Sequence, residues 1–174
     1  AVWSTRGIAP LLWYSGFGAP AARWFLQVDP GTLELQSQFR WGIRVITWIS
    51  RLAGVPIRFP EYVPVDLPLP IIRWIRNTLS SGEVPHIWGY SSVIVRMCQA
   101  AEEAGIDISG VKFTITGEPV TESRLSAIRR VDGDAVTDYG SADTGGSISH
   151  GCLSPMACDD VHIFSDLNAL IQAE

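Results

Sequence analysis

The chain has 174 residues and a mass of 19.0 kDa, the size of one ordinary domain. Hydrophobic residues make up 47% of the sequence and charged residues 18%, which excludes a wholly disordered chain. The net charge of −5 and the pI of about 5.1 argue against a general nucleic-acid binder, which needs a basic face.

The first 55 residues are expected to form an aromatic, glycine-rich segment followed by a helix. A short helix is predicted at 21–27. Apolar residues then recur at helical spacing over 39–52, which predicts a longer helix. Trp41 and Trp48 share one face of that helix, and such pairs usually pack into the core.

The next segment, 56–149, alternates between extended and helical patterns. Ser91 and Ser92 are expected to cap one of its helices. The alternation predicts an α/β fold with a parallel or mostly parallel sheet and flanking helices, followed by a β-rich loop segment. In chain order we expect an extended piece at 55–63, a helix at 71–79, a strand at 85–90, a helix at 93–104, a strand at 111–116, a helix at 121–130 and a strand at 135–139.

Two polar, glycine-containing loops follow strands of this predicted sheet, at 116–119 and at 139–146. In parallel sheets, ligand-binding loops lie beyond the carboxyl ends of the strands. If the two strands are neighbours, both loops face one crevice. Backbone N–H groups, hydroxyls and the carboxylates of Asp138 and Asp143 would suit a nucleotide with magnesium. Each loop taken alone reads more simply as an ordinary turn.

Taken together and in order, the two motifs resemble the adenylate-forming superfamily, most closely its phenylacetate–coenzyme A ligase-like branch. In that branch a GEP or AEP turn, a helix and a YG-x-[ST]-E loop follow one another. Here GEP stands at 117–119, a helix with Arg124 and Ile128 follows, and DYGSAD stands at 138–143. The similarity is clearest over 85–166. It implies a central fragment of the large N-terminal domain of an ATP-dependent acid–coenzyme A ligase.

The resemblance also implies roles for single residues. Asp143 would hold Mg²⁺ in place of the family's glutamate, and Ala142 replaces the usual hydroxyl residue. These two departures leave open whether the site is active. The nucleotide-binding residues would be Gly117, Glu118, Pro119, Asp138, Tyr139, Gly140 and Ser141, and the substrate pocket would include His86, Gly89, Tyr90 and Ser91.

The expected partners follow from the same resemblance: a small carboxylic acid, ATP or AMP with Mg²⁺, and coenzyme A or another acyl acceptor. We find no phosphate loop, and the only lysine, Lys112, falls within a predicted strand. The fragment is therefore expected to be inactive without the missing N- and C-terminal parts of its parent chain. An apolar face left bare by those parts could form a homodimer.

Two histidines and two cysteines crowd into the segment 150–174: His150, Cys152, Cys158 and His162. Two thiolates and two imidazoles satisfy tetrahedral zinc, although the spacing is not that of a standard zinc finger. A disulfide between the cysteines, or no shared role at all, are the alternatives.

The sequence as a whole is interpreted as one domain, 1–174. Its low cysteine count and the lack of an apolar run of about 18 residues indicate a cytoplasmic protein with no membrane partner, and its acidic charge argues against a nucleic-acid partner. Two alternatives to the ligase stay open. One is a non-catalytic module that binds a nucleotide or a partner, and the other is a zinc-stabilised interaction domain.

Overall fold

The computed structural model describes residues 8, 10–12, 14–27, 29, 36–55, 57–141, 146–152 and 154–166, with the backbone alone at 36–40, 141 and 146. The chain forms two compact units, Ala1–Leu67 and Pro68–Glu174. The boundary between them lies inside the segment 56–149, which we expected to form a single α/β core.

The first unit pairs two short strands in parallel, β1 (Trp24–Leu26) with β2 (Pro60–Tyr62). The helix predicted at 21–27 is therefore wrong. The apolar Trp-Phe-Leu run instead pairs with the chain near residue 61, where Arg23 forms an ion pair with Glu61 at 2.6 Å. Pairing with a distant segment outweighs a local helical preference here.

The long helix of this unit is confirmed as α2 (Gln36–Leu52). The burial predicted for its tryptophans is wrong, since Trp41 is 71% exposed and Trp48 is 65% exposed. Ile43, Thr47 and Ser50 occupy the buried side of the helix instead. Helical spacing shows which residues share a face, but it does not show which face turns inward.

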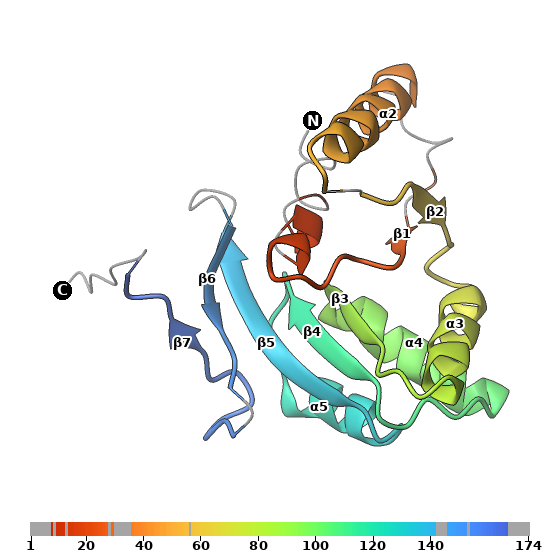
Figure 1. Ribbon diagram of the computed structural model, residues 1–174. Helices are drawn as coiled ribbons and strands as arrows, with labels where there is room; N and C mark the ends of the chain where they lie inside the picture. The colour runs from red at the N-terminus through yellow and green to blue at the C-terminus, as the bar shows by residue number, and fades with distance from the viewer. Residues whose placement is uncertain are drawn as a thin grey trace. The chain divides into compact units, whose positions relative to one another are not determined.

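The second unit carries the predicted alternation of helix and strand (Figure 1). Its strands form a single sheet in the order β3-β4-β5-β6-β7. Strands β3, β4 and β5 are parallel, β6 is antiparallel to β5, and β7 is antiparallel to β6. The predicted α/β fold with a mostly parallel sheet is confirmed. Its elements are α3 (Leu69–Ser80), β3 (His86–Tyr90), α4 (Ser91–Ala104), β4 (Lys112–Thr116), α5 (Glu122–Arg129), β5 (Asp134–Ser141), β6 (Gly146–His150) and β7 (His162–Ile163).

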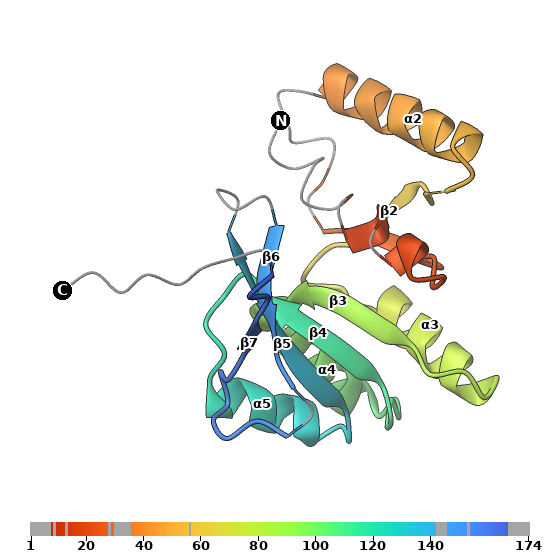
Figure 2. The same cartoon turned by 60° about the vertical axis from the view of Figure 1, so that its left-hand side comes forward.

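Helices α3, α4 and α5 cover one face of this sheet (Figures 1 and 2). The core lies between them and β4, whose Phe113 and Ile115 are almost fully buried. Each helix has a local reason to begin or end where it does. Gly105 ends α4 in the left-handed region at φ 63°, and the Thr121 side chain accepts a hydrogen bond from Arg124 N at the start of α5.

Strand β5 is longer than predicted, because it continues through Gly140 to Ser141 and pairs with β6. The residues after Tyr139 were expected to form a loop beyond the sheet. The first of them belong instead to a β-hairpin with an irregularity between Tyr139 and Gly140. In the described part of the chain, no helix combines the length and the apolar character needed to cross a membrane.

Candidate functional site

Strands β3 and β4 of the second unit end side by side, next to Asp138 of β5, which itself continues to Ser141. Tyr90 is the register partner of Thr116, and Thr116 is the register partner of Asp138. We call this edge, with the turn 117–119 that follows β4, the carboxyl edge. The adjacency expected from the order of the motifs is therefore confirmed for β4 and β5. In α/β sheets, ligands bind at edges of this kind.

The turn after β4 is packed tightly against an aromatic ring. Gly117 has φ +73°, and a Cβ built on it would lie 2.3 Å from Cε1 of Tyr90. No residue other than glycine fits there without a shift. Tyr90 and Tyr139 are both partly exposed at this edge, at 43% and 60%. The carboxyl edge thus presents a tight backbone turn and two partly exposed aromatic rings.

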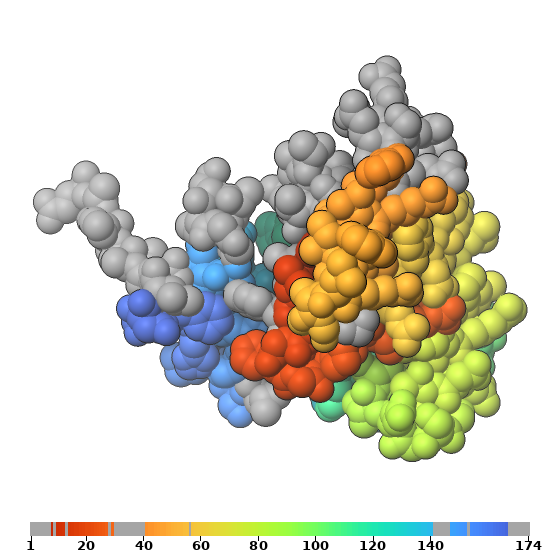
Figure 3. Space-filling view, turned by 45° about the horizontal axis from the view of Figure 1, so that its top comes forward, coloured from red at the N-terminus to blue at the C-terminus, as the bar shows by residue number. Residues whose placement is uncertain are grey.

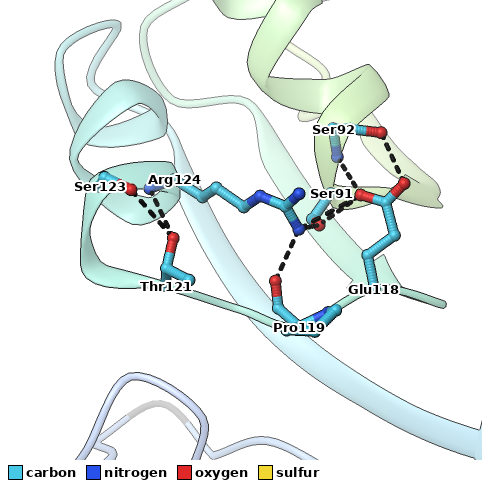
Figure 4. A network of polar contacts seen from close by, with 7 residues as sticks. All are labelled: Ser91, Ser92, Glu118, Pro119, Thr121, Ser123 and Arg124. Carbon is cyan, nitrogen blue, oxygen red and sulfur yellow. Dashed lines mark hydrogen bonds and ion pairs between the residues drawn. The ribbon is translucent and has the colours of Figure 1, made fainter.

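The carboxylate of Glu118 is bound by the first turn of α4 (Figure 4). It accepts hydrogen bonds from Ser91 Oγ at 3.0 Å, from Ser92 N at 2.9 Å and from Ser92 Oγ at 2.7 Å. The two serines were expected to cap this helix themselves. The helix instead begins at Ser91, its N-cap residue is Tyr90, and the Tyr90 side chain makes no capping hydrogen bond. The Glu118 carboxylate, from the neighbouring turn, takes that role, and its negative charge interacts favourably with the positive N-terminal end of the helix.

Arg124 of α5 closes the same network from the other side (Figure 4). Its Nη1 donates to the carbonyl oxygen of Pro119 and to Ser91 Oγ, both at 2.6 Å, and lies 3.2 Å from Glu118 Oε2. These contacts fix the backbone of the turn between two helices. In the sequence, Arg124 is identified only as part of the helix that follows the GEP turn. Its closeness to Glu118 along the chain is the only sequence signal for this contact.

The environment of Glu118 shifts its pKa. Partial burial acts to raise the pKa, but hydrogen bonds from Ser92 and Ser91 and the charge of Arg124 outweigh it, and the pKa lies below its usual 4.5. The ionised form is therefore the one that the folded protein favours. Stability from this carboxylate is present above the unfolded-state pKa and is lost as the pH falls through the lower folded-state pKa.

We expect a Glu118→Gln variant to lose less stability than the parent chain as the pH falls from about 6 to about 3, because glutamine cannot be protonated in that range. Urea unfolding at each pH measures the difference. Glu103→Gln changes an exposed glutamate in α4, the helix that Glu118 contacts, and is the matched control; this variant should keep the acid sensitivity of the unmodified chain. Equal acid sensitivity in the Glu118 variant would contradict the prediction.

The second carboxylate of the edge, Asp138, is also held by protein groups. Ser147 Oγ donates to its Oδ1, and His150 Nδ1 lies 3.6 Å from the same oxygen. Burial acts to raise the pKa of Asp138, but hydrogen bonds from His150, Ser147 and Thr116 outweigh it and lower the pKa. Asp138 is thus an ionised, buried anchor between β5 and β6.

The residues expected in a substrate pocket do not all lie together. Gly89, Tyr90 and Ser91 lie at the carboxyl edge, where β3 passes into α4. His86 begins β3 and pairs in register with Lys112, so it lies at the opposite end of the strand. Its Nε2 lies 2.8 Å from Thr114 Oγ1. Burial and the nearby His150 lower the pKa of His86.

The predicted metal ligands are placed as follows. Asp143, expected to hold Mg²⁺, and its neighbour Ala142 lie outside the described residues, and of Ser141 the structure describes only the backbone. His150 and His162 are opposite one another on β6 and β7, whereas Cys158 Sγ lies 3.8 Å from the carbonyl oxygen of Val120.

Among the residues that the structure describes, no group of three or more His, Cys, Asp or Glu side chains comes together to hold a metal ion. The three cysteines, all within the described ranges, are free, so Cys152 and Cys158 do not form a disulfide here. Zinc at this segment stays a prediction. Lys112 forms an ion pair with Asp134 at the start of the strands, away from the carboxyl edge.

Comparison with known proteins adds no assignment, since no family model and no curated protein matches the chain.

Proposed function

We propose that the carboxyl edge binds the adenine ring of ATP or AMP, and that the chain is the central part of an ATP-dependent acid–coenzyme A ligase. The parallel pairing of β4 and β5 is the observation that supports this most, because it brings the GEP turn beside Tyr139. Two motifs that are separate in the sequence thereby share one edge, as the resemblance requires.

In this proposal the turn 117–119 forms one wall for the adenine and Tyr139 stacks on the ring. Exposed aromatic side chains suit this role, because the face of a base is apolar and flat. Glu118 and Arg124 do not contact the nucleotide here. They hold the turn against α4 and α5, so that the wall is rigid before the ligand arrives.

In the intact ligase, the substrate carboxylate would attack the α-phosphorus of ATP, forming acyl-adenylate and releasing pyrophosphate. The thiol of coenzyme A would then take the acyl group and release AMP. The present residues supply the adenine wall and the start of the acyl pocket, and the charge-stabilising groups of the reaction are expected elsewhere in the parent chain.

Titration of the chain with AMP, followed by isothermal calorimetry, tests the nucleotide site. Tyr139→Ala should weaken binding by about 5- to 150-fold, the range of about 1–3 kcal/mol that one aromatic stack on a base contributes. Tyr62→Ala changes another partly exposed tyrosine, on β2 of the first unit, and should leave the affinity unchanged. Equal affinities of the unmodified chain and the Tyr139 variant for AMP would overturn the proposal.

One observation favours a second candidate, a nucleotide-binding module without catalysis. The carboxylates of Glu118 and Asp138 are both occupied by protein donors, and the single lysine is paired at the other end of β4. ATP–pyrophosphate exchange by the full-length protein, tried with a panel of aryl and aliphatic acids, separates the two. AMP binding without any exchange would indicate the module rather than the ligase.

A further inference from the structure

Helix α2 turns its largest apolar side chains outward. Trp41, Trp48 and Leu52 are 71%, 65% and 70% exposed, and their spacing of seven and four residues places them on one side of the helix. Ile49 beside them is 53% exposed. In Figure 3 this helix, in orange, lies at the surface. We call these four side chains the apolar stripe of α2.

The inward side of α2 is built from smaller and more polar side chains, one of which contacts the chain that follows the helix. Thr47 Oγ1 donates to the carbonyl oxygen of Ile43 at 2.7 Å, and Ser50 Oγ donates to that of Thr47 at 2.9 Å. Ser50 Oγ also accepts a hydrogen bond from Ile57 N at 3.2 Å, which ties α2 to the chain that follows it. Turning the stripe inward would expose Ile43 and break this tie.

The charges of α2 all have one sign. The helix contains Arg40, Arg44 and Arg51 and neither aspartate nor glutamate, although the whole chain has a net charge of −5. Arg44 and Arg51 are exposed on the same outward half as the stripe. A helix that carries tryptophan and leucine on one face and arginine on the flanking polar face is typical of helices that lie in the interface of a membrane. There the indole rings sit at headgroup level and the guanidinium groups meet anionic lipids.

We propose that the apolar stripe of α2, with Arg44 and Arg51, is a docking surface for an anionic lipid bilayer, on which the helix lies flat. The positive charge of the helix favours an anionic membrane over a second copy of the chain as the binding partner. A symmetric dimer through this surface would place arginine against arginine, with no acidic residue of α2 to pair with it. The surface runs against our expectation that the chain has no membrane partner, and it does not depend on the nucleotide site.

Co-sedimentation of the chain with lipid vesicles tests this surface. We expect binding to vesicles of phosphatidylcholine and phosphatidylglycerol in equal parts, little binding to phosphatidylcholine alone, and weaker binding as salt is added. Replacing Arg44 and Arg51 by glutamine should lower partitioning into the anionic vesicles roughly 25-fold, from about fivefold for each arginine. A Trp41→Ser/Trp48→Ser variant should lose binding.

Phe17→Ser is the matched control, because Phe17 is 84% exposed in the same unit but lies outside α2. It should bind the anionic vesicles as the parent chain does, and circular dichroism of each variant checks that the fold is kept. Equal binding by the double tryptophan variant and the parent would overturn the proposal. So would failure of the parent chain to bind anionic vesicles, or sedimentation velocity showing that the stripe is covered in a dimer that the tryptophan changes dissociate.

Discussion

Replacing Gly117 by alanine is expected to lower the free energy of unfolding by about 2–5 kcal/mol and to abolish AMP binding at the carboxyl edge. Two causes add. The backbone of Gly117 has φ +73°, which residues other than glycine rarely adopt, and the new Cβ would lie 2.3 and 2.5 Å from two carbons of the Tyr90 ring. Urea denaturation measures the first effect and calorimetric titration the second.

The chain offers a matched control for the two causes. Gly82 has φ +85°, but a Cβ there would meet nothing within 4 Å, so Gly82→Ala should cost only the backbone part, about 1–2 kcal/mol. Adding Tyr90→Ala to the Gly117 variant should restore the part that comes from the ring. Equal costs at Gly117 and Gly82 would show that the Tyr90 contact contributes nothing to stability.

Gly151→Ala is expected to destabilise the second unit by about 2–4 kcal/mol, through overpacking and the loss of a backbone hydrogen bond. A Cβ on Gly151 would lie 2.8 Å from the backbone nitrogen of Thr137 and 3.1 Å from its oxygen. Gly151 N also donates to that oxygen at 2.5 Å. Backbone atoms cannot rotate away as a side chain does, so β5 and the chain after β6 would have to separate.

Thermal unfolding of the Gly151 variant checks this expectation, with Gly89→Ala as the control. A Cβ on Gly89 would meet only Ile94 at 3.7 Å, which is ordinary contact, so that variant should unfold close to the parent. Separation of the strands would also draw His150 away from Asp138. A Gly151 variant as stable as the parent would mean that this close approach can relax without cost.

The helices and the parallel strands of the second unit could be predicted from the sequence because local signals agree there. Gly105 and Thr121 mark helix ends, and β4 is a run of β-branched and aromatic residues. The first unit was harder to predict. Its strand β1 depends on pairing with β2, and the orientation of α2 depends on packing and on the hydrogen bond from Ile57 N to Ser50 Oγ, which no periodicity reveals.

The carboxyl edge was predictable from topology, but its chemistry was not. Neighbouring parallel strands end at one edge, so the closeness of Thr116 and Asp138 followed from the motif order. That Glu118 binds Ser92, 26 residues away in the chain, could not be inferred, because the sequence patterns of helix caps involve only residues next to the helix itself. His86 is the opposite case. It is close to Tyr90 in the sequence, but the two residues are the first and last of β3 and therefore lie at opposite ends of the strand.

The strand order of the second unit bears on how it folds. Because β3, β4, β5, β6 and β7 lie in the sheet in the same order as in the chain, each strand meets the next one along the chain. Each parallel pairing closes one loop that contains a single helix, and the entropy lost on closing a loop grows only slowly with its length. This sheet could therefore assemble strand by strand as the chain leaves the ribosome, with each α-helix added between one parallel strand and the next.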